Sequence, residues 1–301
     1  MSLAIVIPYY KIKYFRECLQ SLENQTNKDF KVYIGNDGSP DDPGMLIKEF
    51  SRSLNIEYRY FKNNLGNSSL VAHWERCLKP LRSERWLMFL GDDDLLGPNC
   101  VEKFYENQNL IEKNKINVVR FSTVVINKSG EPISKRFLHP ELEDSVDFLF
   151  RKLNGETRSS LSEYVFRISA VRRNQFKDFP LAWHTDDLAL LEFSNAEKIY
   201  SINDAKVCFR NSGDNITSTS NLNTLKNKAS FQFYYYLLND KKEYFNHFQL
   251  NYLVRKLEAC YNNDKKNYLF FIKFTKTMLR NGFLGEYINF FRLKLLKSFQ
   301  N

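Results

Sequence analysis

Apolar runs and segments with one apolar stripe alternate along the N-terminal part of the chain, and this alternation most constrains the fold. The run "LAIVIP" (3–8) is apolar throughout, which is typical of a strand covered on both faces. Phe15, Cys18, Leu19 and Leu22 follow at helical spacing, which predicts a helix that buries one stripe. Strands and helices in alternation predict a parallel sheet with helices on both faces.

The same pattern continues to residue 90. "FKVYIGNDG" (30–38) predicts a second strand that ends in a turn, "IEYRYF" (56–61) a third strand, and "RWLMFL" (85–90) a fourth. The segment between the third and fourth strands predicts a helix whose inner face carries Leu70, Val71, Trp74 and Leu78. Parallel sheets of this kind bind ligands beyond the carboxyl ends of their strands.

Polar residues cluster at three of these strand ends. They are "PYYK" (8–11), "NDGSPDD" (36–42) and "GDDDLLGP" (91–98), and we expect them to lie side by side along one edge of the sheet. The third cluster holds three consecutive carboxylates, which repel each other unless a cation lies nearby. Aspartates in a row also suit solvated turns and helix N-caps. Their position after three ordered strand and helix units favours a binding site.

The charge of the chain divides it into two parts. Residues 1–220 carry 30 basic and 30 acidic residues, whereas residues 221–301 carry 14 and 5, so the net charge of +9 comes from the tail. The tail also holds 19 of the 46 aromatic residues. The polar stretch "NSGDNITSTSN" (211–221) is typical of a loop. We therefore predict one domain over 1–220 and a basic, aromatic-rich helical region over 221–301.

Cysteine usage and hydropathy both suggest an intracellular protein. The five cysteines are far apart and form no Cys-x-x-Cys pair, so we expect reduced thiols packed as small hydrophobic residues. No apolar stretch approaches the roughly 18 to 20 residues that a membrane span requires. The first ten residues lack the basic start and the cleavage site of a signal peptide. We expect a cytoplasmic location.

Two stretches carry a resemblance to a known family. They are "IVIPYYKIKYFRECLQSLENQTNKDFKVYIGNDGSPDD" and "RWLMFLGDDDLLGPNCVEKF". In order and spacing, residues 1 to about 215 resemble the family 2 glycosyltransferases that build bacterial polysaccharides and other glycans. The resemblance implies the α/β GT-A fold, a Rossmann-like, mixed but mostly parallel sheet between helices, here followed by a C-terminal helical extension. It also implies a nucleoside diphosphate sugar as the donor.

The aspartate triplet matches the metal motif of that family. The usual Asp-x-Asp-Asp pattern falls on Gly91, Asp92, Asp93 and Asp94, so Gly91 replaces the first aspartate. A diphosphate leaving group needs a hard cation such as Mn²⁺ or Mg²⁺, which takes oxygen ligands. The resemblance implies that Asp93 is a metal ligand, with Asp94 as the second ligand and Asp92 in contact with the nucleotide sugar. The departure at Gly91 leaves the order of Asp92 and Asp94 open.

The resemblance also assigns residues to the nucleotide. Pro8 and Tyr10 are expected to line the pocket of the base, and Asp37 is expected to accept a hydrogen bond from a ring N–H. A carboxylate acceptor suits uracil or thymine, and guanine also satisfies it. Arg210, in "VCFRNSGDN", resembles an arginine that clamps the diphosphate in a bidentate manner. An ordinary surface arginine is the alternative.

The stretch "AWHTDDLALLEF" (182–193) contains the predicted catalytic base. Thr185 followed by Asp186 and Asp187 is typical of a capped helix start, which by itself requires no catalysis. The resemblance implies that Asp187 is the general base, with Asp186 beside it. The helix dipole favours the ionised carboxylate that a base requires. The implied reaction is a single in-line displacement that inverts the anomeric carbon.

Two further side chains precede this acidic pair. Trp183 is expected to stack on a sugar ring, and His184 to hydrogen-bond the acceptor or the diphosphate. The alternative is an aromatic pair that only orients the helix. The sequence does not distinguish these two roles.

The tail predicts three or four helices with basic residues between bulky apolar ones. Its last segment, 283–299, is basic and amphipathic, so it can rest on a membrane whose headgroups are anionic. This predicts a peripheral position at the inner face of the cell membrane. A helix packed on the catalytic domain is the alternative.

These features predict a metal-dependent, hexosyltransferase-like enzyme. It would move a sugar from a UDP- or dTDP-sugar to a hydroxyl of a glycan or lipid-linked saccharide. A nucleotidyltransferase would need a glycine-rich phosphate loop, which "PYYKIKYF" lacks. A catalytically silent sugar-nucleotide or glycan-binding module would need neither Asp93 nor Asp187. The pI of about 9.1 suggests nucleic-acid binding as another function. No known motif supports it, and we expect no such partner.

Overall fold

The computed structural model describes residues 2–213, 219–288 and 292, and the chain divides into two compact units. The first unit comprises Met1–Asp178 and Thr185–Thr219. The second comprises Phe179–His184 and Ser220–Asn301. All five cysteines are free thiols, and four of them are buried, as predicted.

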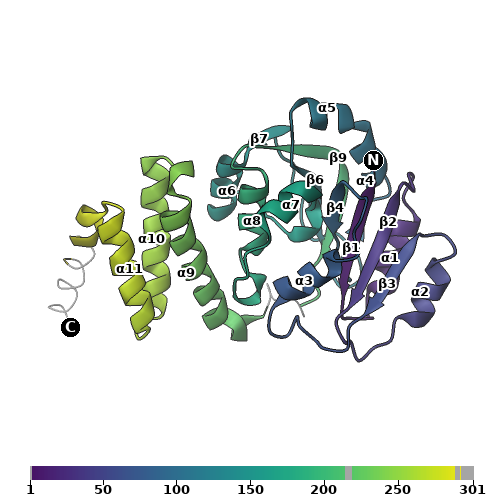
Figure 1. Cartoon of the computed structure of the whole chain (residues 1–301), viewed down its shortest axis with the longest axis horizontal. Helices are drawn as coiled ribbons and strands as arrows, with labels where there is room; N and C mark the ends of the chain where they lie inside the picture. The colour runs from purple at the N-terminus through teal and green to yellow at the C-terminus, as the bar shows by residue number, and fades with distance from the viewer. Residues whose placement is uncertain (1, 214–218, 289–291, 293–301) are drawn as a thin grey trace. The chain divides into compact units, whose positions relative to one another are not determined.

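A mixed sheet forms the centre of the first unit (Figure 1). In the described residues its strands follow the order β3-β2-β1-β4-β8-β6-β9-β5, and β7 pairs with β9. The first four in sequence, which were predicted, are parallel: β1 (Leu3–Tyr9), β2 (Phe30–Asn36), β3 (Ile56–Tyr60) and β4 (Trp86–Phe89). The others are β5 (Leu95–Leu96), β6 (Val118–Ile126), β7 (Leu142–Asp144), β8 (Tyr164–Arg167) and β9 (Lys198–Arg210).

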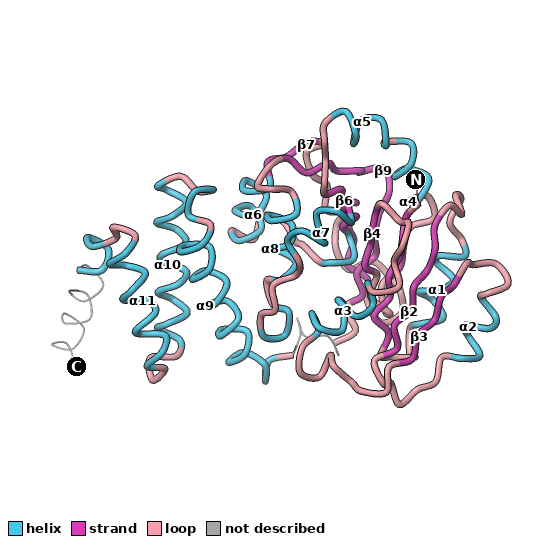
Figure 2. Tube along the Cα trace, viewed as in Figure 1, coloured by secondary structure: helices cyan, strands magenta, loops and turns pink. Residues whose placement is uncertain are grey.

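Helices cover both faces of this sheet (Figure 2). They are α1 (Phe15–Glu23), α2 (Gly44–Phe50), α3 (Leu70–Leu78), α4 (Cys100–Glu106), α5 (Gln108–Lys113), α6 (Ser145–Leu153), α7 (Ile168–Asn174) and α8 (Thr185–Phe193), with the short turn η1 (Leu161–Glu163). On one face, Ile5 and Ile7 of β1 share a buried cluster with Phe15 of α1 and Phe104 of α4. The predicted stripe of α1 is buried in full.

Aromatic rings fill the opposite face of the sheet. Phe176, which follows α7, lies 5.7 Å from Phe89 of β4 and 5.0 Å from Phe193 of α8, measured between ring centroids. Phe166 of β8 meets Phe193 at 5.2 Å and nearly a right angle. Edge-to-face pairs of this kind add about 0.5–1.5 kcal/mol each beyond the buried area. This cluster fixes β4, and with it the start of the aspartate triplet.

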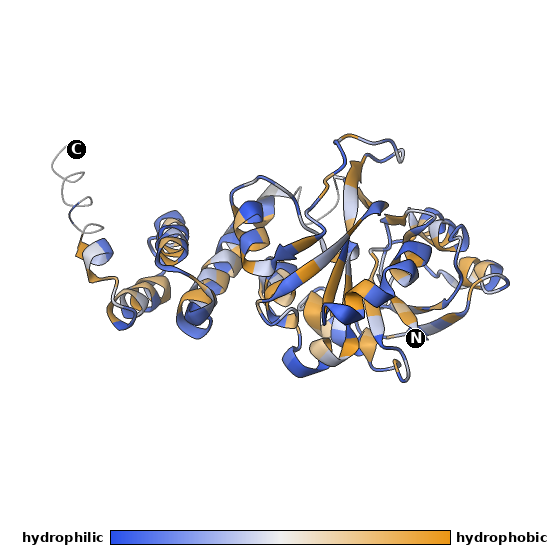
Figure 3. Cartoon of the chain, turned by 90° about the horizontal axis from the view of Figure 1, so that it is seen from above, coloured by the Kyte–Doolittle hydropathy of each residue, from blue (hydrophilic) through white to orange (hydrophobic). Residues whose placement is uncertain are grey.

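The second unit is helical. Its helices are α9 (Asn223–Asp240), α10 (His247–Asn263) and α11 (Tyr268–Arg280), with the short turns η2 (Pro180–Ala182), η3 (Ser220–Leu222) and η4 (Lys242–Tyr244). Phe231 of α9 stacks on Phe270 of α11 with ring centroids 3.9 Å apart. Figure 3 shows hydrophobic and hydrophilic residues alternating around these helices. The tail is thus helical, as predicted.

Two points concern the predicted membrane contact. Most of the segment 283–299 lies outside the described residues, so its role stays a prediction. Among the residues that the structure does describe, no helix combines the length and the apolar character needed to cross a bilayer.

Candidate active site

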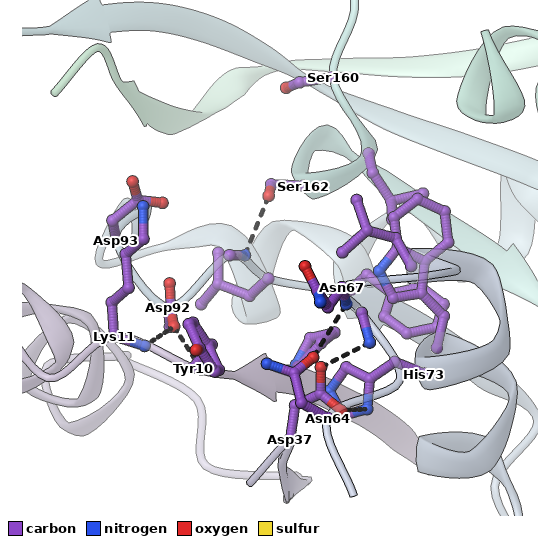
Figure 4. A pocket seen from close by; sticks show the side chains of 18 of the residues that line it. Tyr10, Lys11, Asp37, Asn64, Asn67, His73, Asp92, Asp93, Ser160 and Ser162 are labelled. Carbon is purple, nitrogen blue, oxygen red and sulfur yellow. Dashed lines mark hydrogen bonds and ion pairs between the residues drawn. The ribbon is translucent and has the colours of Figure 1, made fainter. Parts of the chain in front are cut away.

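A cavity of about 500 Å³ opens at the carboxyl ends of β1, β2 and β4 (Figure 4). All three predicted polar clusters contribute to its wall, as the order of the strands led us to expect. The lining residues are Pro8, Tyr10, Lys11, Asp37, Asn64, Gly66, Asn67, Leu70, His73, Trp74, Phe89, Leu90, Gly91, Asp92, Asp93, Ser160, Leu161, Ser162 and Phe209. Both apolar and charged side chains contribute to the lining.

Asp92 ties two strand ends together. Its Oδ2 accepts hydrogen bonds from the backbone N–H groups of Tyr10 and Lys11, both at 2.7 Å. Burial raises the pKa of Asp92 to about 6, although these two N–H groups lower it. The carboxylate therefore holds the loop after β1 against the end of β4.

Asp94 is buried and anchored by two other segments. Its Oδ2 accepts a hydrogen bond from Ser162 Oγ at 2.6 Å, and its Oδ1 accepts one from the backbone N–H of Arg210 at 2.9 Å. Burial raises the pKa of this carboxyl as well. Asp94 does not line the cavity, so a direct contact with a metal stays a prediction.

Asp93 is the member of the triplet whose carboxylate is left for a ligand. It lines the cavity, and in the described part of the chain the hydrogen bond that it accepts from Arg210 goes to its backbone carbonyl and not to its carboxylate. Burial, followed by the charges of Asp94 and Asp92, raises its pKa to about 7, while Lys11 lowers it. Figure 4 shows Asp93 and Lys11 on the same side of the cavity. This electrostatic setting favours a bound cation.

The donor set fits a cation that is shared with a substrate. Among the described residues, no group of three or more His, Cys, Asp or Glu side chains is placed to hold a metal ion. Mg²⁺ commonly binds through one or two carboxylates and completes its coordination with substrate phosphates and water. Asp93 beside Asp92 and Asp94 matches that arrangement.

Gly91 lies close to the carboxylates of Asp93 and Asp94. A Cβ added there would lie 3.0 Å from Asp94 Oδ2 and 3.2 Å from Asp93 Oδ1. The backbone N–H of Gly91 donates a hydrogen bond to Ser162 Oγ at 3.1 Å. A larger side chain at position 91 would therefore require the carboxylates of Asp93 and Asp94 to shift by a few tenths of an ångström.

Asp37 also lines the cavity, but its carboxylate already has several partners. Its oxygens accept hydrogen bonds from the N–H groups of Leu65 and Gly66, both at 2.8 Å, and it pairs with Arg76. A Cβ on Gly66 would lie 2.5 Å from Asp37 Oδ2, so only glycine fits. Four lone-pair sites leave room for one more donor. A contact with the base stays a prediction.

Two residues of this corner were not predicted. His73 lies 3.4 Å from Asp37 and accepts a hydrogen bond from Arg76 Nε at 3.0 Å. Burial lowers the pKa of His73 to about 4, so its ring is neutral at neutral pH. His73 and Arg76 are three residues apart, which puts both on one face of the helix. This spacing was the signal in the sequence that they could act together.

Arg210 is fully buried and does not line the cavity. Its Nε donates to the carbonyl of Asp93 at 2.9 Å, and its other nitrogens contact Glu17 and the carbonyls of Asn127 and Lys128. These contacts support a role in positioning the triplet. The predicted diphosphate clamp stays a prediction.

Asp186 and Asp187 lie in the first turn of helix α8, so the predicted helix start is confirmed, whereas the hydroxyl of Thr185 donates to the carbonyl of Lys177 at 2.8 Å. Asp187 is 2% exposed and forms an ion pair with Lys152 of α6, a partner that the sequence did not indicate. Burial, followed by the charge of Asp187, raises the pKa of Asp186 to about 6. Neither side chain lines the cavity described above.

Trp183 and His184 belong to the second unit. His184 stacks on Phe233 with ring centroids 4.5 Å apart, and its Nε2 lies 3.0 Å from Ser230 Oγ. The ammonium of Lys226 lies 5.1 Å from the ring centre of Trp183. These contacts suit the structural alternative, and contacts with donor or acceptor stay predictions.

The raised pKa values give a prediction for stability. Because the pKa of Asp93 is about 7 when folded and about 4 when unfolded, the folded chain binds the extra proton between these values. Stability without divalent cations should therefore fall as pH rises from about 4 to 7. In Asp93→Asn, the decrease in the free energy of unfolding between pH 4 and 7 should be smaller than in wild type by on the order of 1 to 3 kcal/mol. Urea unfolding in EDTA across that range measures it.

Asp29→Asn is the matched control, because Asp29 is exposed and does not line the cavity. Asp186 and Glu163 also have raised pKa values, but they contribute equally to wild type and variant. Asp92 and Asp94 lose the repulsion of the Asp93 charge in the variant, which reduces the fall further in the same direction. The same pH dependence in wild type and Asp93→Asn would contradict the prediction.

Comparison with known proteins agrees with this fold. The sequence profile described as "Glycosyl transferase family 2" matches residues 4–179. The described fold is that of the GT-A glycosyltransferases. It superimposes on the structure of S. aureus TarS 1-349 in complex with UDP-GlcNAc with a TM-score of 0.61 and 15% sequence identity. The superposition covers 92% of this chain and 80% of the TarS chain. The chain belongs to glycosyl transferase family 2.

Curated relatives match parts of the chain. The "GalNAc(5)-diNAcBac-PP-undecaprenol beta-1,3-glucosyltransferase" of Campylobacter jejuni is 25% identical over 190 residues, 59% of this chain and 55% of the relative. "Glycosyltransferase GlyA" of Streptococcus pneumoniae is 30% identical over 106 residues, 35% of this chain. The matched region spans only 15% of the length of GlyA.

Proposed function

We propose that this chain transfers a sugar from a UDP- or dTDP-sugar to a hydroxyl of a glycan or lipid-linked saccharide, with inversion and with the help of Mn²⁺ or Mg²⁺. One observation carries the proposal: the carboxylate of Asp93 faces a cavity at the carboxyl ends of the parallel strands, and its partners in the triplet are anchored elsewhere. Membership of the glycosyltransferase family supports the reaction class.

In this proposal Asp93 holds the cation, and Asp92 and Asp94 keep the surrounding charge negative. The bound cation would neutralise the charge that develops on the departing diphosphate. Asp92 also fixes the loop that carries Tyr10 and Lys11, which line the same wall. Lys11 would add a second positive charge beside the phosphates.

The nucleotide base would occupy the corner formed by Pro8, Tyr10 and Asp37. Asp37 is held rigidly by Arg76 and by the N–H groups of the loop after β3, so its remaining lone pair has a fixed direction. A fixed carboxylate acceptor selects a base with a ring N–H. TarS has been solved with UDP and with UDP-GlcNAc, which supports a uracil nucleotide.

Asp187 would act as the general base. It would take the proton from the acceptor hydroxyl while that oxygen attacks the anomeric carbon, and the nucleoside diphosphate would leave from the opposite face. An opposite charge such as that of Lys152 favours the ionised form of a carboxylate, which is the form that a base requires. The Campylobacter jejuni relative is named for an undecaprenol-linked saccharide, which supports a lipid-linked acceptor.

Calorimetric titration with UDP, dTDP and GDP, with and without Mn²⁺, tests the donor half of the proposal. We expect UDP or dTDP to bind, and Mn²⁺ to strengthen that binding. UDP-sugars incubated with and without a lipid-linked saccharide would then show whether the sugar reaches an acceptor. If no nucleotide binds under any of these conditions, the proposed function fails.

A further inference from the structure

One face of helix α11 exposes large apolar side chains. Four of them are between 42% and 71% exposed: Tyr268, Leu269, Ile272 and Leu279. At 100° per residue they fall within about one third of the helix circumference. The opposite side packs inside the second unit through Phe270, Phe274 and Met278.

The same helix carries an unbalanced positive charge. Between Lys265 and Arg280 the chain has five basic residues and no acidic one: Lys265, Lys266, Lys273, Lys276 and Arg280. All five are exposed. Lys276 and Arg280 lie between and beside the exposed apolar residues on the helix surface, because positions three and four apart are neighbours.

Two more exposed apolar residues follow the helix in the sequence. Leu284 and Ile288 are 54% and 58% exposed. Exposed apolar residues that occur singly need no explanation, but a contiguous group marks an interaction surface. We name the exposed apolar and basic residues of 265–288 the α11 face.

We infer that the α11 face binds the surface of an anionic lipid bilayer. The helix would lie in the plane of the interface, with Leu269, Ile272 and Leu279 among the acyl chains and the cations at the headgroups. Basic residues next to an anionic leaflet are attracted to it, and long side chains reach up to the phosphates. The inference does not depend on the proposed sugar transfer.

Charge argues against a second copy of this chain as the occupant. A two-fold interface would place the same surface on both sides, so five cations would face five cations. Like charges brought together at an interface oppose association. An anionic bilayer offers both an apolar interior and negative headgroups, and it therefore matches the whole face.

Vesicle flotation of the full chain tests the inference. The vesicles are phosphatidylcholine alone, or equal parts of phosphatidylcholine and phosphatidylglycerol. We expect flotation with the mixed vesicles only, weakened at high salt because the headgroup attraction is screened. Leu269→Ser with Leu279→Ser, and separately Lys276→Glu with Arg280→Glu, should each lower the bound fraction about tenfold or more.

The matched control is Met45→Ser with Lys48→Glu on helix α2, where Met45 is 87% exposed and Lys48 is also exposed. This control should float like wild type, and circular dichroism should show that every variant is folded. Wild type that stays soluble with the mixed vesicles would overturn the inference. So would α11 variants that float normally, or a dimer in sedimentation that those variants dissociate.

Discussion

Asp93→Asn is expected to abolish the effect of Mn²⁺ on nucleotide binding. The variant loses the carboxylate that faces the cavity, while the hydrogen bonds of Asp92 and Asp94 remain. Residues that only support metal ligands contribute about 10- to 100-fold to metal affinity, so removing the ligand itself should cost more than about 100-fold. Calorimetric titration of UDP into the variant, with and without Mn²⁺, measures the loss.

Asp29→Asn serves again as the control, because it removes one exposed carboxylate without touching the cavity. The control should bind UDP and Mn²⁺ like wild type. If Asp93→Asn keeps metal-dependent binding, the cation is held by Asp92 or Asp94 instead. A wild type that binds no nucleotide would instead reject the proposed function, so the two failures are distinguishable.

Asp187→Asn is expected to lower turnover by about 10²- to 10⁴-fold while donor binding is kept, since this is the usual contribution of a general base. Asparagine has the same shape but cannot accept the proton. Turnover of the donor at saturating acceptor, together with the nucleotide titration, separates chemistry from binding. Unchanged turnover would place the base on another residue.

The buried ion pair with Lys152 requires a second variant. Removing either partner of such a pair is destabilising, so a purely structural role would give Asp187→Asn and Lys152→Gln similar losses. If Asp187 is the base, Lys152→Gln should retain more activity. The acidic limb of the pH–rate profile of Lys152→Gln should also move to higher pH. The carboxylate of Asp187 has then lost the cation that stabilises its charged form.

Residue patterns in the sequence were sufficient for the first four strands of the sheet and for the edge at which the cavity lies. Strands such as β1 are buried on both faces, so their apolar runs are continuous and easy to recognise. The order of strands then placed the residues after β1, β2 and β4 at one edge. Local patterns therefore carried most of this information.

The roles within the aspartate triplet could not be read from the sequence. Three identical residues in a row differ only in what surrounds them, and those partners come from distant segments. Asp92 is engaged by the loop after β1, and Asp94 by Ser162 and Arg210. Only the tertiary structure shows that Asp92 and Asp93 both line the cavity, and that Asp92 is already hydrogen-bonded by the backbone of Tyr10 and Lys11.

Helix α3 shows a second limit of sequence patterns. Its apolar stripe predicted a core-facing surface, and Val71 is buried in this way. Leu70 and Trp74 of the same stripe instead line the cavity, whereas His73 is buried beside Asp37. An apolar stripe indicates that one face of a helix turns inward, but it does not distinguish the core from the wall of a cavity.

The anchoring of the triplet by β9 has a consequence for how the site is assembled. Arg210 binds the carbonyl of Asp93 across 117 positions of sequence, and the family profile ends at residue 179, before β9 begins. Contacts of such long range are closed late in folding, after the local helices and strand pairs have formed. A growing chain therefore carries all three aspartates long before they can work together. The contacts that anchor the triplet are complete only when β9 pairs with β6, so we expect a chain that lacks β9 to lose the proposed nucleotide binding.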